Sequence, residues 1–339
     1  MEGGGSKVNM DKQKLEDIAK KIVAKSKGIL AADESSGTIK KRLDSINVES
    51  TEDSRRNYRQ LLFEASGIEN YISGVILFDE TIRQQTDAGK KLIEILSDKN
   101  IIAGIKVDMG AKDLAFYPGE KITEGLTGLR ERLAEYSELG AGFSKWRAVI
   151  ELGDGIPTDA CIDANTHALA RYAALSQEAG IVPVVEPEVL MTGTHTIEEH
   201  AEITKKTLQI VFKELNKYRV HIPGMLLKPN MIATGLDGDI QSTSQEVAEA
   251  TLAVFKEVLP DELPGIVFLS GGLSPDSATA HLAAINSRGD QPWELSYSFG
   301  RALQGEALDV WQGKSENTEA AQKALIERAK KVSQARDGI

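Results

Sequence analysis

Eight short apolar runs recur along the chain, and most of the gaps between them carry the hydrophobic spacing of helices. The runs cover residues 28–33, 74–79, 101–108, 143–150, 181–188, 224–230, 265–272 and 295–300. Such continuously apolar runs are typical of strands that are buried on both faces, as in a parallel sheet. Apolar positions three and four apart predict helices over residues 11–27, 163–179, 196–217, 244–258 and 277–285.

Eight strands alternating with helices predict an α/β fold, a single-domain TIM (β/α)8 barrel over residues 1–339. A doubly wound open sheet is the alternative. That fold normally carries a glycine-rich dinucleotide loop after its first strand, and residues 33–38 do not match one. No Pro/Gly/Ser-rich linker divides the chain. We expect a short flexible N-terminus at residues 1–10 and a helical C-terminal region at residues 316–339.

Charged side chains stand at the ends of five of these apolar runs, where burial makes them costly unless they are paired. Residues two apart share a face of a strand, so Lys145 lies with Arg147 and Glu186 with Glu188, and Lys106 shares its face with Asp108. Barrel enzymes place their active sites at the carboxyl ends of the strands. We therefore expect one polar cluster there, made of Asp33, Lys106, Lys145, Glu186 and Lys228.

This cluster suits carbonyl chemistry. A lone lysine at a strand end usually extends to water, but two further lysines would lower its pKa and free its lone pair for attack on a ketone. A glutamate beside the lysines, Glu186, suits proton shuttling, and Asp33 suits deprotonation of a hydroxyl during carbon–carbon cleavage. The pattern alone does not say which lysine is the nucleophile.

Anion binding has candidates at the ends of the seventh and eighth runs, where barrels frequently bind phosphate. Ser270-Gly271-Gly272 and Gly300-Arg301 offer backbone N–H groups, and Ser277 and Arg301 lie near predicted helix starts. The alternative is that these glycines serve only turns. A second basic site is possible at Lys41, Arg42 and Arg147, although Lys41 and Arg42 also fit a solvated helix face.

Composition narrows the function classes. A net charge of −11 argues against nucleic-acid partners, and no apolar run is long enough for a membrane span. Cys161 is alone, which favours a structural thiol, a reducing compartment and a cytoplasmic location. No metal is expected, since the five histidines, at positions 167, 195, 200, 221 and 281, show no helical zinc pair.

Seven motifs, in order along residues 15–330, resemble the class I fructose-bisphosphate aldolases, the metal-independent, Schiff-base type. They are Leu-Ala-Ala-Asp-Glu-Ser (30–35), Gly-Ile-Lys-Val-Asp (104–108), Lys-Trp-Arg-Ala-Val (145–149), Val-Pro-Val-Val-Glu-Pro-Glu (182–188), Leu-Leu-Lys-Pro-Asn-Met (226–231), Phe-Leu-Ser-Gly-Gly (268–272) and Phe-Gly-Arg-Ala-Leu-Gln (299–304). The resemblance implies reversible cleavage of fructose 1,6-bisphosphate to dihydroxyacetone phosphate and glyceraldehyde 3-phosphate, a step of glycolysis and gluconeogenesis.

The resemblance also implies roles for single residues. Lys228 would form the Schiff base, with no other cofactor, and Glu186 would shuttle protons. Asp33 would be the base for cleavage, while Lys145, Lys106 and Glu188 would support the charge of the cluster. The ketone-side phosphate would be bound by residues 270–272, 300 and 301. The other phosphate would be bound by Lys41, Arg42 and Arg147. The partners would be sugar phosphates and further copies of the chain in a tetramer.

One departure concerns the C-terminus. Animal members of the family end in a flexible tail with a terminal tyrosine that assists proton transfer at the enamine carbon, whereas the last tyrosine here is Tyr297. We therefore expect slower proton exchange on dihydroxyacetone phosphate, or a different group for that step.

Two other functions remain open from the residues. One is another Schiff-base lyase or transferase on a barrel, such as a transaldolase-like enzyme with one phosphate site. The other is a non-catalytic scaffold, although a scaffold has no use for buried charges that cost stability.

Overall fold

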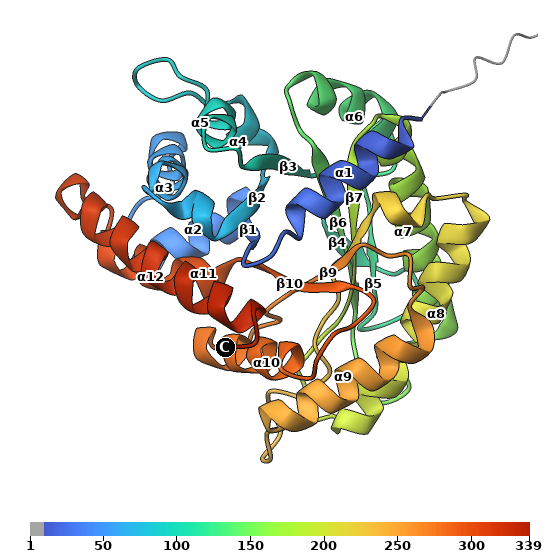
Figure 1. The fold of residues 1–339 in the computed structure, drawn as a ribbon. Helices are drawn as coiled ribbons and strands as arrows, with labels where there is room; N and C mark the ends of the chain where they lie inside the picture. Colours follow the sequence, from blue (N-terminus) through green and yellow to red (C-terminus); the bar gives the residue numbers. More distant parts are fainter. Residues whose placement is uncertain (1–9) are drawn as a thin grey trace, which may run out of the picture.

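The predicted barrel is confirmed in the computed structural model, which describes residues 10–339 (Figure 1). Eight parallel strands close in the order β1-β10-β9-β8-β7-β6-β3-β2. Each predicted run contributes one of them. They are β1 (Gly28–Ala32), β2 (Ile72–Leu77), β3 (Ile102–Lys106), β6 (Phe143–Ile150), β7 (Val182–Val189), β8 (Leu226–Leu227), β9 (Gly265–Phe268) and β10 (Glu294–Phe299). The expected flexible N-terminus lies outside the described residues, except for Met10.

Helices surround the ring of strands (Figure 1). The α-helices are α1 (Lys12–Ile22), α2 (Ser36–Asp44), α3 (Glu52–Glu64), α4 (Asp79–Arg83), α5 (Leu92–Asp98), α6 (Leu129–Glu138), α7 (Asp159–Glu178), α8 (Ile197–Lys217), α9 (Ser244–Val258), α10 (Pro275–Asn286), α11 (Arg301–Trp311) and α12 (Thr318–Arg336). Short 3-10 helices are η1 (Ile68–Asn70), η2 (Ile222–Gly224) and η3 (Ser315–Asn317). The five helices predicted from apolar spacing are present, as α1 and α7 to α10, and the predicted helical C-terminal region is α12.

A small hairpin was not predicted from the sequence. Strands β4 (Ala111–Asp113) and β5 (Lys121–Thr123) pair antiparallel after β3, outside the barrel. All three residues of β4 are exposed, so the hairpin has no buried apolar run that could have revealed it.

Inward-facing residues alternate with outward-facing ones along the barrel strands. Ile29, Val184, Leu226 and Val267 form the interior cluster together with Phe143, whose ring leaves no room for a Cβ on Gly104. A Cβ there would lie 2.3 Å from that ring, so the position requires glycine.

Helix α1 closes one end of this interior. Leu15, Ala19 and Ile22 are fully buried and belong to the same cluster as the inward-facing residues. Leu15 also lies against Gly224, just before β8, so α1 covers the amino ends of the strands. The polar site is therefore confined to the opposite end, at the carboxyl ends.

Helix α12 is held near the same amino end. Asp337, the residue after the helix, accepts hydrogen bonds from the backbone N–H and the hydroxyl of Ser26, which precedes β1. Arg336 pairs with Glu294 at the start of β10. Within residues 10–339, no helix has the length and apolar character required to cross a membrane.

Candidate active site

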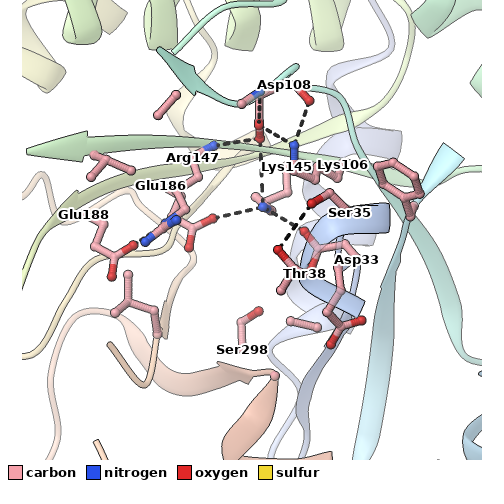
Figure 2. Close-up of a pocket in the computed structure, with 18 of the residues that line it drawn as sticks. Asp33, Ser35, Thr38, Lys106, Asp108, Lys145, Arg147, Glu186, Glu188 and Ser298 are labelled. Atoms are coloured by element: carbon pink, nitrogen blue, oxygen red, sulfur yellow. Dashed lines mark hydrogen bonds and ion pairs between the residues drawn. The ribbon is translucent and has the colours of Figure 1, made fainter. Parts of the chain in front are cut away.

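A cleft of about 1280 Å³ opens at the carboxyl ends of the barrel strands. The side chains in Figure 2 converge on it from β1, β3, β6, β7 and β10 or from the segments that directly follow them. Every site residue predicted from the sequence, except the anion-binding candidate Ser277, lines this one cleft. These residues are Asp33, Lys41, Arg42, Lys106, Lys145, Arg147, Glu186, Glu188, Lys228, Ser270, Gly271, Gly272, Gly300 and Arg301. Their roles remain predictions.

Lys145 stands at the centre of an ionic cluster. Its Nζ lies 2.8 Å from Asp33 Oδ2, 3.4 Å from Glu186 Oε2 and 3.9 Å from Asp108 Oδ2 (Figure 2). Burial alone would lower the pKa of this ammonium, but the three carboxylates outweigh burial and raise the pKa well above its usual value. The prediction that neighbouring lysines lower the pKa of a lysine therefore does not hold for Lys145, because three carboxylates surround its ammonium group.

Lys228 is in a different position. It follows β8, is only 4% exposed, and its Nζ lies 3.3 Å from Glu186 Oε1. Among the described residues, that is its one carboxylate within 4 Å, against three for Lys145. Of these two buried lysines, Lys228 therefore has fewer nearby carboxylates to stabilise its charge. It is the better candidate for a nucleophile, a choice that the sequence left open.

Asp33 is suited to act as a base because it stays ionised. Burial raises the pKa of this carboxylate, but Lys145, Lys228 and Lys106 together lower it to about 2. Its carboxylate points into the cleft from the end of β1 (Figure 2).

Asp108 is a cleft residue that the sequence analysis did not select. It pairs with Lys106, and it accepts hydrogen bonds from the backbone N–H groups of Gly110 (3.1 Å) and Arg147 (3.2 Å). The signal was present, since Lys106 and Asp108 share a strand face. Asp108 ties the end of β3 to β6 and supplies the third carboxylate around Lys145.

Arg147 and Glu188 form a pair on the neighbouring strands β6 and β7. Burial lowers the pKa of the guanidinium, but Glu188 outweighs that effect and the pKa is raised. Arg147 therefore stays charged at the mouth of the cleft, where its side chain is 43% exposed and accessible to an anion.

The predicted ketone-side phosphate site has the backbone geometry that anion binding needs. Gly271 and Gly272 have φ values of +55° and +91°, in the left-handed region that favours glycine. Gly300 begins α11 without a side-chain cap, which leaves the first N–H groups of that helix without a side-chain partner. Arg301 donates to the Gly272 carbonyl at 3.0 Å and so links the two loops. Ser277, by contrast, lies in the first turn of α10, where its backbone N–H donates to the hydroxyl of the capping residue Ser274 at 3.1 Å.

Arg42 lies closer to this site than the sequence analysis assumed. Its Nη2 is 3.6 Å from the position that a Cβ would occupy on Gly300. Its guanidinium also pairs with Glu34, which accepts a further hydrogen bond from Gln304 at 3.0 Å. Arg42 is therefore placed beside the loop assigned to the ketone-side phosphate, whereas the resemblance grouped it with Lys41 and Arg147.

Three other polar residues of the cleft were not predicted from the sequence, because none of them belongs to a charged motif. Ser35 and Thr38 lie at the start of α2, with their hydroxyl oxygens 3.2 Å apart. Ser298, on β10, also lines the cleft. Its signal was the alternation of serines in the run Leu295-Ser-Tyr-Ser-Phe299.

Histidine and cysteine lie elsewhere. His200 is buried between the Ala233 and Val189 carbonyls, and burial lowers its pKa to about 4. The Cys161 thiol is buried near the start of α7, where burial and Glu120 raise its pKa to about 11. Across residues 10–339, no group of three or more His, Cys, Asp or Glu side chains is arranged to hold a metal ion.

The family of the chain follows from comparison with known protein families. Residues 14–339 match the model of the glycolytic family described as fructose-bisphosphate aldolase class-I. The chain belongs to this family. Its members are enzymes that act as aldehyde-lyases, and the motif resemblance seen in the sequence is thereby confirmed.

Individual aldolases are similar over almost their whole length. A probable fructose-bisphosphate aldolase class 1 of Xylella fastidiosa is 52% identical, over 95% of this chain and 96% of the relative. The fructose-bisphosphate aldolase of Dictyostelium discoideum is 47% identical, over 92% and 88%. A solved structure of the Plasmodium falciparum aldolase, in complex with TRAP and a small-molecule inhibitor, superimposes with a TM-score of 0.95 at 46% identity, covering 96% of this chain and 95% of the other.

Proposed function

We propose that this aldolase cleaves fructose 1,6-bisphosphate reversibly through a Schiff base on Lys228. The observation that carries the proposal is the contrast between the two most buried lysines of the cleft. Lys145 is surrounded by three carboxylates, whereas within residues 10–339 Lys228 has one, Glu186 at 3.3 Å. Because fewer carboxylates surround Lys228, we assign its amine to the attack on the ketone.

Glu186 has the position needed to move protons during this attack. Its two oxygens lie 3.3 Å from Lys228 and 3.4 Å from Lys145. As the amine adds to the ketone, a proton must pass from nitrogen to the former carbonyl oxygen before water can leave. A carboxylate that contacts the nucleophile directly can carry that proton. Lys145 stays charged and contacts the second oxygen of Glu186 at 3.4 Å.

Asp33 then accepts the hydroxyl proton as the carbon–carbon bond breaks. A base must be unprotonated before it acts, and a pKa of about 2 keeps Asp33 ionised throughout the neutral range. Lys145, at 2.8 Å, holds it in place. We assign Lys106 and Glu188 supporting roles, since each is paired with an opposite charge at the rim of the cluster. These steps need no metal.

We assign the ketone-side phosphate to Ser270, Gly271, Gly272, Gly300 and Arg301, and we add Arg42 because it lies beside Gly300. Lys41 and Arg147 remain as candidates for the second phosphate. We further propose that the enzyme forms homotetramers, as the family resemblance implies, and that it works in the cytoplasm, as its single cysteine favours. Light scattering on the purified chain would test the tetramer.

Borohydride reduction in the presence of dihydroxyacetone phosphate tests the Schiff base. We expect a stable adduct of the triose phosphate, mapped by mass spectrometry to Lys228. Lys228→Arg should abolish both the adduct and cleavage, whereas Lys41→Ala, which changes a lysine at the edge of the cleft, should keep the adduct. An adduct on another lysine would overturn the residue assignment, and no adduct at all would overturn the mechanism.

Kinetics with one and two phosphates distinguishes a bisphosphate aldolase from a transaldolase-like enzyme. Lys41→Ala should raise KM for fructose 1,6-bisphosphate but not for fructose 1-phosphate, because only the first substrate has a second phosphate. Arg42→Ala should raise KM for both substrates. If Lys41→Ala affected the two substrates equally, the cleft would have a single phosphate site.

A further inference from the structure

Arg59 carries a buried charge behind the cleft, and the proposed mechanism gives this residue no role. It lies on α3, is 1% exposed and does not line the cleft. Burial lowers the pKa of its guanidinium, but a guanidinium stays charged in proteins. Its Nε and Nη1 have no hydrogen-bond partner among the described residues. A buried charge with so few partners costs stability, so stability alone does not account for Arg59.

The guanidinium of Arg59 contacts Glu34, the cleft residue that follows Asp33. Its Nη2 donates to the main-chain carbonyl of Glu34 at 2.8 Å and lies 3.8 Å from the carboxylate oxygen Oε2. Within residues 10–339 that oxygen has no hydrogen-bond partner, whereas the other oxygen, Oε1, accepts from Arg42 and from Gln304. Glu34 therefore lies between two guanidinium groups, one at the cleft and one behind it.

A second carboxylate near Arg59 belongs to Glu80, which is already paired. Glu80 lies 3.6 Å from Nη1 of Arg59, but it accepts two hydrogen bonds from Arg55. The pair of Glu80 and Arg55 is neutral as a unit, so the charge of Arg59 acts mainly on Glu34. Arg42, Glu34 and Arg59 then form a triad of two guanidinium groups and one carboxylate, which leaves one positive charge in excess.

The triad reaches the proposed ketone-side phosphate site through Arg42. Its Nη2 lies 3.6 Å from the position that a Cβ would occupy on Gly300. Paired with Glu34 alone, Arg42 would belong to a neutral unit, and a neutral pair attracts a phosphate only weakly. A further positive charge behind Glu34 restores an attractive field at this edge of the cleft, and its burial limits screening by water.

We propose that Arg59 is a positioning residue of the ketone-side phosphate site, an inference that rests on the proposed function. Arg59 offsets the charge of Glu34, so that the charge of Arg42 remains available to the phosphate. It acts through Glu34 and does not itself touch the substrate, since it does not line the cleft. Substrates with one and with two phosphates share the ketone-side phosphate, so both depend on Arg59.

Arg59→Met and Arg328→Met form a matched pair that tests the proposal. Arg328 is also buried, with a side chain 5% exposed, but it pairs with Asp276 and Glu306, and none of these three residues lines the cleft. Arg59→Met should raise KM for fructose 1,6-bisphosphate and fructose 1-phosphate about tenfold each, with little change in kcat, because it weakens ground-state and transition-state binding equally. Arg328→Met should leave both KM values unchanged, whatever its effect on the melting temperature.

A double variant separates the effect of charge from general disruption. Arg59→Met combined with Glu34→Gln removes one positive and one negative charge, so the triad keeps its wild-type net charge. This variant should bring KM for fructose 1-phosphate back toward the wild-type value. A double variant as impaired as Arg59→Met would refute the proposal, because a second substitution does not repair a role that is only structural.

Binding without turnover separates this inference from the proposed function. The Kd of dihydroxyacetone phosphate, measured by isothermal titration calorimetry, should rise in Arg59→Met by a factor similar to that of KM, and should stay at the wild-type value in Arg328→Met. An unchanged Kd in Arg59→Met would refute the role of Arg59, even where the unmodified enzyme forms the Lys228 adduct with borohydride. Failure of the unmodified enzyme to form that adduct would refute the Schiff-base function, whereas weaker binding in Arg59→Met would still support the role of Arg59.

Discussion

At the scale of single residues, the chemistry of the cleft depends on how charges are shared. Three lysines at strand ends suggested mutual repulsion, yet Asp33, Asp108 and Glu186 lie among them. The result is an unequal distribution of carboxylates, with Lys145 strongly paired and Lys228 weakly paired. That inequality, more than the number of lysines, is the basis on which we propose Lys228 as the nucleophile.

The lowered pKa of Asp33 predicts how stability depends on pH. Its pKa falls from 3.8 to about 2 on folding, so the ionised carboxylate stabilises the native state above about pH 4. This contribution of about 2 kcal/mol is lost as the pH falls from 4 to 2. Urea unfolding at a series of pH values should show it, because the difference in unfolding free energy between wild type and Asp33→Asn should shrink over that interval. A constant difference would mean that Lys145 does not hold Asp33 ionised.

At the scale of the element, helix starts are encoded locally. Thr196 begins α8 with a capping box, in which its hydroxyl accepts from Glu199 N and Glu199 accepts from Thr196 N. Thr243 and Glu246 repeat the arrangement at α9. These helices were predicted within one residue of their bounds because the caps lie next to regular apolar patterns.

Removing one of these caps should cost stability but not activity. Thr196→Ala should lower the free energy of unfolding by about 1 kcal/mol, since it leaves a helical N–H without its acceptor. Thr194→Ala, two residues earlier at an exposed position, is the control and should have almost no effect. Both variants should keep wild-type kcat, because α8 begins outside the lysine cluster. A large fall in kcat for Thr196→Ala would show that this loop contributes to the site.

At the scale of the whole molecule, the barrel is closed at its amino end by a helix from outside the ring of strands. Helix α1 buries Leu15, Ala19 and Ile22 against the strand interior. This covering allows the carboxyl end to hold charged groups without exposing the apolar interior at the other end. The barrel is thus polar at its carboxyl end and apolar at its amino end.

Leu15→Ala should reveal the energetic importance of this covering helix. The side chain is fully buried, so its truncation should lower the free energy of unfolding by about 3 kcal/mol. Ile18→Ala, on the same helix but only partly buried, should cost clearly less. Denaturant titration measures both. Equal small effects would mean that α1 is not an integral part of the core.

The sequence by itself determined the eight strands, six of the helices and the family, because buried parallel strands and regular helices leave their pattern in consecutive residues. It also marked Lys228, Glu186 and Asp33 as charges in unusual places. Only the tertiary structure decided which carboxylate faces which lysine, that Arg42 lies beside Gly300, and that the Ser298 hydroxyl has no hydrogen-bond partner in the described part of the chain. Those facts depend on strands far apart in the chain meeting at a common offset around a closed ring, and no local pattern records that offset.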